Sequence, residues 1–155
     1  VELFATLYSS STDPNLILDR VDLKKKKDSY FKTLSGGQKQ RLSIAVALVN
    51  DPKVLFFDEP TTGLDPQARR NLWELIKSFQ GEGKTIVLTT HYMEEAEELC
   101  DRVAIIDEGK IIKIDSPSNL IDELTKTGFK TTKKIKEATL EDVFISLTGK
   151  SLREE

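Results

Sequence analysis

The sequence predicts an α/β protein with a mostly parallel sheet and flanking helices. Strand-like and helix-like segments alternate through the middle of the chain, with strands expected at 54–57, 85–90 and 103–106 and helices between them. This order implies parallel strands joined by crossover helices. With 155 residues, of which 38% are hydrophobic and 32% charged, the chain is long enough to bury one core.

Residues 1–33 are expected to form a polar, mostly helical lobe. Helices are expected at 1–8 and 15–21, and the Asp-Pro pair at 13–14 between them is typical of a turn. The four lysines at 24–27 are expected to lie in a solvated loop or on a helix face, as short runs of like charge usually do.

Two helices flank the first expected strand. The earlier one follows Ser35 and is expected to stop at residues 51–52, and the later one is predicted to be capped by Asp65 with Pro66 in its first position. Each helix has apolar residues at helical spacing: Leu42, Ala45, Val46 and Val49 in the first, and Leu72, Leu75, Ile76 and Phe79 in the second. The apolar run at 54–57 has no polar alternation, so we expect a strand covered on both faces.

Beyond the second strand, a short acidic helix is expected at 93–100. Its glutamates are expected to be solvated, whereas Trp73 in the preceding helix is expected to be a packing residue. The Glu-Gly pair at 108–109 predicts a hairpin turn that leads into a strand at 110–115.

The end of the chain is predicted to be helical in two places. A helix follows the Ser-Pro pair at 116–117 and runs to about residue 124, and a last helix begins near residue 140 and is stopped by Gly149. Residues 125–137 are basic and weakly patterned, and are expected to form a loop or a small strand.

Two parts of the chain have features of a site that handles phosphate groups. Leu-Ser-Gly-Gly-Gln at 34–38 opens a helix, where free backbone N–H groups and the helix dipole favour an anion. A helix cap alone would need the serine, but not two glycines followed by glutamine. Asp58 and Glu59 close the first expected strand, and His91 follows the second. Because ligands of open parallel sheets bind beyond the carboxyl ends of the strands, we expect these three side chains to face one crevice.

Each of these residues also has a plainer structural role to weigh. Asp58 could cap the next loop, Glu59 could be a solvent-facing acid at a strand end, and a lone histidine such as His91 is most often a packed or exposed side chain.

In this order the motifs resemble the ATP-binding domain of an ABC transporter, over residues 1 to about 124. LSGGQ is similar to the signature motif of that family, and Phe-Phe-Asp-Glu-Pro at 56–60 is similar to its Walker B strand with the adjoining catalytic glutamate. Gly-Leu-Asp at 63–65 resembles the D-loop, and His91 stands where the family has its switch histidine. The final LEDVF…LTG segment is similar to the C-terminus of drug- and polymer-exporting members. The resemblance implies a phosphate-loop NTPase (RecA-like) fold, a parallel sheet with flanking helices, together with part of the helical subdomain.

The resemblance also implies the cofactors, ATP and Mg²⁺, and a role for each residue. Asp58 is expected to hold the metal through water, Glu59 to act as general base for the water that attacks the γ-phosphate, and His91 to hold that water in place. The remaining residues are expected to act across a dimer interface on ATP held by the opposite subunit: Ser35, Gly36, Gly37, Gln38 and Asp65.

One motif of that family does not occur in the chain. A phosphate loop has the pattern Gly-x-x-x-x-Gly-Lys-Ser/Thr, and two partial matches fail it. Gly-Lys-Thr at 83–85 has Ser78 where the first glycine belongs, and Gly-Lys-Ser at 149–151 has Phe144 there. The chain also begins with Val1 rather than Met. We therefore expect a domain truncated at the N-terminus.

By resemblance, the chain divides into a helical subdomain with the signature helix at 1–50, a catalytic lobe at 51–124 and a C-terminal extension at 125–155. The expected function is ATP hydrolysis that powers export across a membrane. The implied partners are a membrane-spanning permease subunit, which the lobe at 1–33 would meet, and a second ATP-binding cassette. The expected location is the cytoplasmic face of the cell membrane, through the partner.

Composition is consistent with that location. The longest apolar runs fall well short of the roughly 18 residues of a membrane span, and the single cysteine, Cys100, suits a reducing compartment. The net charge of −3 gives no general attraction to nucleic acid, so no such partner is expected.

Two other functions remain open from the sequence. One is a non-transport ABC ATPase of DNA repair or translation, although those proteins usually carry two cassettes or long coiled insertions. The other is a non-enzymatic module that supplies only a signature surface to the ATP site of a partner.

Overall fold

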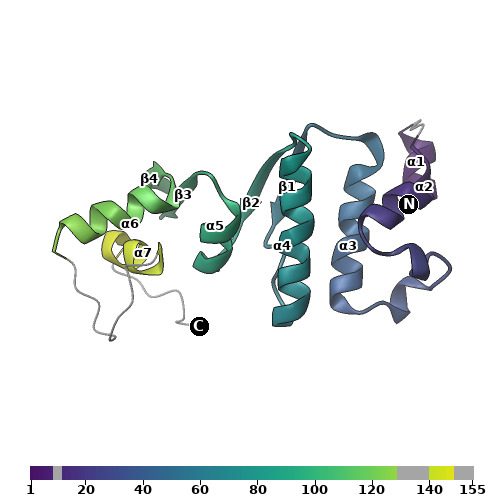
Figure 1. Cartoon of the computed structure of the whole chain (residues 1–155), viewed down its shortest axis with the longest axis horizontal. Helices are drawn as coiled ribbons and strands as arrows, with labels where there is room; N and C mark the ends of the chain where they lie inside the picture. The colour runs from purple at the N-terminus through teal and green to yellow at the C-terminus, as the bar shows by residue number, and fades with distance from the viewer. Residues whose placement is uncertain (9–11, 129–139, 149–155) are drawn as a thin grey trace. The chain divides into compact units, whose positions relative to one another are not determined.

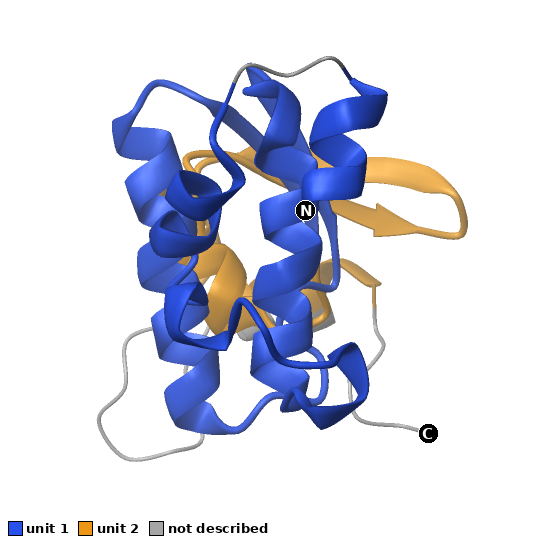
Figure 2. Ribbon diagram, turned by 90° about the vertical axis from the view of Figure 1, so that its right-hand side faces the viewer, with its two compact units in different colours: residues 1–89 blue, residues 90–155 orange. Residues whose placement is uncertain are grey.

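A computed structural model describes residues 1–8, 12–128 and 140–148, which form two compact units (Figures 1 and 2). The chain passes from the first unit to the second between Thr89 and Thr90. This boundary falls inside the segment 51–124, for which the sequence predicts a single catalytic lobe. No helix of the described residues is long and apolar enough to cross a membrane.

The first unit begins with short helices and continues with a strand–helix–strand segment. Its elements are α1 (Glu2–Leu7), α2 (Pro14–Arg20), the 3-10 helices η1 (Lys24–Lys26) and η2 (Phe31–Thr33), α3 (Gly36–Ala47), η3 (Leu48–Asn50), β1 (Val54–Asp58), α4 (Pro66–Gly81) and β2 (Thr85–Thr89). The predicted helices and strands of this part are thus confirmed to within a few residues. The Asp-Pro pair at 13–14 starts α2 instead of forming a separate turn, because the Asp13 carboxylate accepts a hydrogen bond from the Asn15 N–H and caps the helix.

The helices α3 and α4 lie side by side, and both contribute buried residues to the core of this unit (Figure 1). In α4 the buried face matches the prediction except at one position, where Trp73 is buried and Leu75 only partly so. Of the four residues at helical spacing in the first helix, Ala45 and Val49 are buried and Leu42 and Val46 are partly buried. The fully buried residues there and in η3 are Ile44, Ala45, Leu48 and Val49. Contacts with α2, α4 and η3 select this face, and these neighbours are not visible in the helix's own sequence.

The strands β1 and β2 pair in parallel, with α4 as the crossover between them. Leu55 and Phe57 point into the core, but Val54 is 45% exposed and Phe56 is 76% exposed. The expectation that this strand is covered on both faces was therefore wrong for the described residues. Val87 of β2, the register partner of Phe56, is likewise 45% exposed, so one face of the parallel pair is apolar and open.

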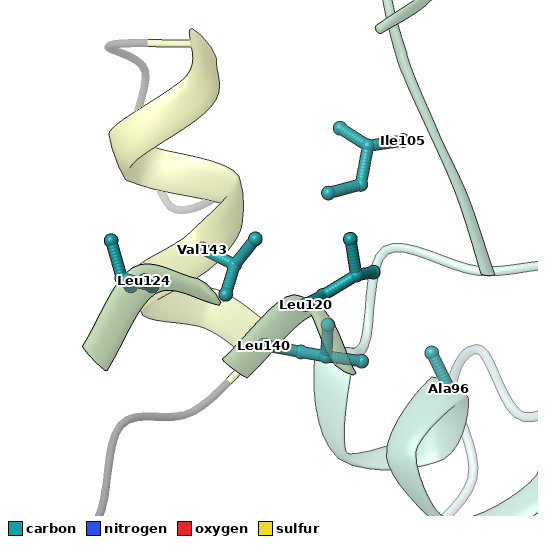
Figure 3. Close-up of a cluster of buried hydrophobic side chains, with 6 residues drawn as sticks. All are labelled: Ala96, Ile105, Leu120, Leu124, Leu140 and Val143. Carbon is teal, nitrogen blue, oxygen red and sulfur yellow. The ribbon is translucent and has the colours of Figure 1, made fainter. Parts of the chain in front are cut away.

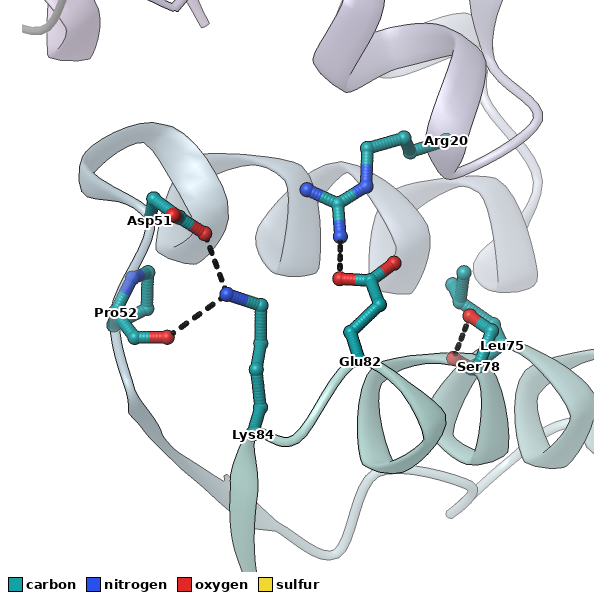
Figure 4. Close-up of polar contacts among 7 residues, drawn as sticks. All are labelled: Arg20, Asp51, Pro52, Leu75, Ser78, Glu82 and Lys84. Carbon is teal, nitrogen blue, oxygen red and sulfur yellow. Dashed lines mark hydrogen bonds and ion pairs between the residues drawn. The ribbon is translucent and has the colours of Figure 1, made fainter.

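Two ion pairs tie the end of α4 and the start of β2 to the preceding helices (Figure 4). The Arg20 guanidinium at the end of α2 pairs with the Glu82 carboxylate and lies 5.5 Å from the ring centre of Phe79. The Lys84 ammonium donates to the Asp51 carboxylate and, at 3.1 Å, to the Pro52 carbonyl. Its hydrogen bond and charge hold the pKa of Asp51 below the ordinary value.

The second unit contains α5 (Met93–Leu99), β3 (Val103–Asp107), β4 (Lys110–Asp115), α6 (Pro117–Lys126) and α7 (Leu140–Thr148). The strands β3 and β4 form the predicted hairpin, in which Glu108 and Gly109 both have positive φ, 49° and 73°. The sequence placed β3 in the same parallel sheet as β1 and β2, but in the described chain it pairs only with β4 and is antiparallel to it. A parallel pair and an antiparallel hairpin thus replace the single, mostly parallel sheet that was expected.

The core of the second unit lies between α5, the hairpin, α6 and α7 (Figure 3). Its fully buried members are Ala96, Ile105, Leu120, Leu124, Leu140 and Val143. The acidic helix α5 is not simply a solvated surface, because Glu95 is completely buried and the Glu97 carboxylate accepts the Leu140 N–H at 2.7 Å. Residues 125 and 126 belong to α6, and the rest of the expected loop beyond residue 128 lies outside the described residues.

Candidate functional site

The acidic pair lies at the carboxyl end of the parallel strands. Asp58 is the last residue of β1, and Glu59 follows it directly. The hydroxyl of Thr89, the last residue of β2, donates to Asp58 Oδ1 at 2.5 Å. The Glu59 N–H in turn donates to both the carbonyl oxygen and the hydroxyl oxygen of Thr89, at 3.1 and 3.2 Å. Thr89 therefore links the end of β2 to both acidic residues at the end of β1.

The backbone of Glu59 adopts an unusual conformation, with φ of 44° in the left-handed region. Non-glycine residues rarely adopt this conformation, and when they do it is often at functional sites. The residue is held from both sides. Thr62 donates its hydroxyl to Glu59 Oε2 at 2.8 Å and its N–H to the Glu59 carbonyl at 3.2 Å. The carboxylate thus has a defined direction, at an exposed strand end where a solute can reach it.

The predicted signature residues form the N-terminus of α3. Ser35 caps the helix by accepting the Gln38 N–H at 3.3 Å, and the Gln38 side chain accepts the Ser35 N–H at 3.0 Å. Gln38 therefore has a structural role in this cap that the sequence prediction did not assign to it.

The two glycines of the signature differ in their surroundings. A Cβ at Gly36 would meet no atom closer than 3.9 Å, the Leu64 Cδ2, whereas a Cβ at Gly37 would lie 3.4 Å from the Ala68 Cβ. Gly37 thus lies close to α4, where a side chain larger than alanine has little room. Packing leaves Gly36 unexplained, as expected where another molecule approaches the backbone.

Asp65 caps α4 as predicted, accepting the N–H groups of Gln67 and Ala68 at 3.0 and 2.9 Å. Its neighbour Leu64 is the side chain nearest to Gly36, so the expected D-loop and the signature segment lie together. The first unit therefore brings together the loop that follows Glu59 and the N-terminus of α3.

His91 lies in the second unit, two residues after the end of β2. Its ring lies 4.1 Å from the ring of Tyr92, whose N–H is bound by the Thr90 hydroxyl at 3.0 Å. The sequence prediction that His91 shares a crevice with Asp58 and Glu59 remains a prediction.

Two threonines of the site were missed by the sequence analysis. Thr89 donates a side-chain hydrogen bond to Asp58, and Thr62 donates one to Glu59. For Thr89 a signal was present, since it is a polar residue closing the strand expected beside the strand of Asp58. For Thr62 there was none, because its bond depends on the conformation of the loop.

The donor set at this edge fits Mg²⁺ and phosphate. Magnesium is usually held by one or two carboxylates together with water and the phosphates of its substrate. The described residues contain no cluster of three or more potential metal-binding side chains, so they match this kind of site and not an all-protein metal cage. Asp58 would hold the ion, since the Thr89 bond engages only its Oδ1.

The only cysteine in the sequence is not suited to nucleophilic chemistry at neutral pH. Burial, assisted by the negative charges of Glu95 and Asp101, raises the pKa of the Cys100 thiol to about 11. The thiolate is the reactive form, so the acidic pair is the better candidate for chemistry.

An α/β fold with acids at the carboxyl end of parallel strands and a glycine-rich helix start is the arrangement of a nucleotide-handling protein. Comparison with known proteins agrees. Residues 6–62 match the model of the ABC transporter family.

Two relatives of the chain are also named as ATP-binding proteins of export systems. The chain is 56% identical over 105 residues to the Nod factor export ATP-binding protein I of Paraburkholderia xenovorans (strain LB400), a match that covers 68% of this chain and 34% of that protein. It is 52% identical over 108 residues to the protein of the same name from Rhizobium etli (strain ATCC 51251), which covers 70% of this chain and 34% of the relative. These comparisons support an ABC transporter ATP-binding domain. The chain spans about a third of the length of the curated relatives it matches.

Proposed function

We propose that this chain is part of the ATP-hydrolysing subunit of an ABC transporter that powers export. The observation that carries the proposal is the acidic pair at the end of β1, with Asp58 and Glu59 held in place by the end of β2. The relatives named for Nod factor export support the export class, and the similarity of the C-terminal segment to exporters of drugs and polymers points the same way.

In this function each residue of the pair has its own task. Asp58 holds Mg²⁺, which when bound neutralises the charge on the phosphates of ATP. Glu59 accepts a proton from the attacking water and orients it, and its Oε2 is already given a direction by Thr62. For His91 the proposed role, carried over from the family resemblance alone, is a hydrogen bond to the γ-phosphate.

The N-terminus of α3 acts on a second nucleotide. Backbone N–H groups at a helix start favour the negative charge of a phosphate, and Gly36 leaves room for it. With Ser35, Gly37 and Gln38, and with Asp65 near the interface, this surface completes the ATP site of an opposite cassette. The partners are a second cassette and a membrane-spanning permease subunit, which holds the protein at the cytoplasmic face of the membrane.

The test uses the complete ATP-binding domain, which here means this chain joined to a phosphate-loop lobe. In that protein Glu59→Gln should abolish steady-state ATP hydrolysis and leave ATP binding nearly intact, because an amide preserves the shape of the side chain but cannot accept the proton. Glu74→Gln is the matched control, since Glu74 is an exposed glutamate on the face of α4 directed to solvent.

Phosphate release and nucleotide binding are measured for each protein. Hydrolysis at the unmodified rate in Glu59→Gln would show that another residue activates the water. Absence of ATP hydrolysis in the unmodified complete domain would contradict the proposed function itself. Rate stimulation by DNA would favour the non-transport class.

A further inference from the structure

We propose that Thr89 is a positioning residue of the hydrolytic site, whose hydroxyl ties the Asp58 side chain to the Glu59 backbone. The proposal rests on the proposed function and deepens it, because it concerns the same acidic pair. Thr89 itself does not touch the reacting atoms.

The first argument is that one hydroxyl serves both acids. A hydroxyl has a single hydrogen and two lone pairs. An ionised carboxylate can only accept, so the hydrogen of Thr89 is directed to Asp58 Oδ1, at 2.5 Å. The oxygen then accepts the Glu59 N–H at 3.2 Å. The orientation of the metal-binding carboxylate and that of the general base's backbone are thereby coupled.

The second argument is that both acids need such support. Glu59 has φ of 44°, a conformation that persists in a non-glycine residue only where the surroundings hold it. Its N–H is shared between the hydroxyl and the carbonyl of the same threonine. Asp58 is an exposed residue at a strand end, and the bond to Thr89 selects one orientation of its carboxylate and leaves Oδ2 for a ligand.

The third argument is that the arrangement follows from the strand register. Asp58 and Thr89 are register partners in the parallel pair and are 31 residues apart in sequence. Thr85 lies on the same strand and, with the period of two, on the same face, but its register partner is Val54. The strand thus contains a threonine at the site and a matched threonine away from it.

The first experiment measures hydrolysis by the complete ATP-binding domain. Thr89→Val removes the hydroxyl and keeps the shape, and it should lower kcat by about 10- to 100-fold, the range typical of partners that orient metal ligands. KM for ATP should not change, because the phosphate loop supplies the binding. The Mg²⁺ concentration for half-maximal rate should rise. Thr89→Ser should restore both quantities, and Thr85→Val should behave as the unmodified protein.

A second experiment uses the 155-residue chain itself and does not depend on hydrolysis. In its NMR spectra Thr89→Val should accelerate hydrogen exchange of the Glu59 amide and should average the Hα–Hβ couplings of Asp58. Thr89→Ser and Thr85→Val should leave both unchanged. If Thr89→Val does not fold, Thr89→Ala provides the same comparison with less bulk.

Equal kcat in Thr89→Val and Thr85→Val, or a Thr89→Ser protein as impaired as Thr89→Val, would overturn the proposal. An unchanged Glu59 amide and unchanged Asp58 couplings would also overturn it. A complete domain without ATP hydrolysis would refute the proposed function, whereas the NMR measurements would still decide the role of Thr89.

Discussion

At the scale of single residues, the two glycines at the start of α3 differ in how closely neighbouring side chains approach them. A Cβ at Gly37 would lie 3.4 Å from the Ala68 Cβ, whereas a Cβ at Gly36 would meet only the Leu64 Cδ2, at 3.9 Å. A substitution at Gly37 that lowers activity could therefore act through the packing of α3 against α4 as well as through nucleotide binding. Gly36 is the position at which function can be tested alone.

We expect Gly36→Ala to change the free energy of unfolding of the chain by no more than about 1 kcal/mol, since alanine is at least as good a helix former as glycine. In the complete ATP-binding domain the same change should lower ATP hydrolysis, because the added methyl group obstructs the phosphate expected at this helix start. Thermal unfolding and phosphate release measure the two effects.

Gly81→Ala is the matched control, because Gly81 is also helical and a Cβ there would meet nothing within 4 Å. A Gly36→Ala protein that hydrolyses ATP as fast as Gly81→Ala would contradict a close approach of nucleotide to the signature backbone.

At the scale of elements, the ion pair between Lys84 and Asp51 anchors the start of β2 to the segment before β1. The Lys84 side chain is 9% exposed and that of Asp51 is 74% exposed. Lys84 lowers the pKa of Asp51 from its ordinary value of 3.8. A lowered carboxyl pKa contributes stability above the ordinary value, and that contribution is lost as the pH falls through the folded-state pKa.

We expect Lys84→Met to lower the free energy of unfolding at pH 7 by about 1 kcal/mol, a modest value because Asp51 is largely exposed to solvent. The difference from the unmodified chain should shrink as Asp51 is protonated below its ordinary pKa. Urea unfolding at pH 7, 5 and 3 measures this. Lys53→Met, which changes an exposed lysine in front of β1, is the control and should show no such pH dependence. A Lys84→Met effect that is the same at pH 7 and pH 3 would rule out the charge interaction as its source.

The elements also show which parts of the fold can be predicted from residues that are close together in the sequence. The cap of α4 was predicted, because Asp65 acts on N–H groups two and three residues away. The cap of α2 is equally local, since Asp13 acts on the N–H two residues away, although the Asp-Pro pair at 13–14 was predicted to form a turn. The sheet to which β3 belongs was not predicted, because strand pairing depends on segments distant in sequence. The burial of Ile44 in α3 and of Leu48 in η3 was not predicted for the same reason, because contacts with neighbouring helices determine which residues of this segment are buried.

In the candidate site, too, local features could be predicted from the sequence and features that depend on distant segments could not. Asp58 and Glu59 could be placed at a strand end from the order of residues alone. The hydrogen bonds of Thr62 and Thr89 could not, because they need the loop conformation and the strand register.

At the scale of the whole molecule, the chain has a helix start and an acidic pair for nucleotide but no phosphate-loop pattern. Its parallel pair also presents an open apolar face that includes Phe56. Parallel sheets normally have both faces covered. Both facts agree with the prediction from the sequence that a phosphate-loop lobe is needed to complete the nucleotide site, which stays a prediction.

We expect the 155-residue chain alone to bind magnesium-ATP only weakly and to show no turnover above background, because the lysine and backbone cradle for the β- and γ-phosphates are missing. Isothermal titration calorimetry with magnesium-ATP measures this, with the complete ATP-binding domain as the positive control. Low-micromolar affinity of the chain alone would show that its nucleotide site is complete without a phosphate loop.

The parallel pairing of β1 and β2 also determines when the site can form during folding. Parallel neighbours cannot be joined by a tight turn, so the whole of α4 must be in place before Thr89 reaches Asp58. Bringing the two strands together lowers the chain entropy before the contacts between them contribute favourable free energy. Non-local pairings of this kind are therefore slow to form. On the ribosome, Asp58 and Glu59 therefore emerge well before the residue that orders them. The acidic pair gains its geometry only in the nearly finished unit, so an incompletely folded chain cannot present it.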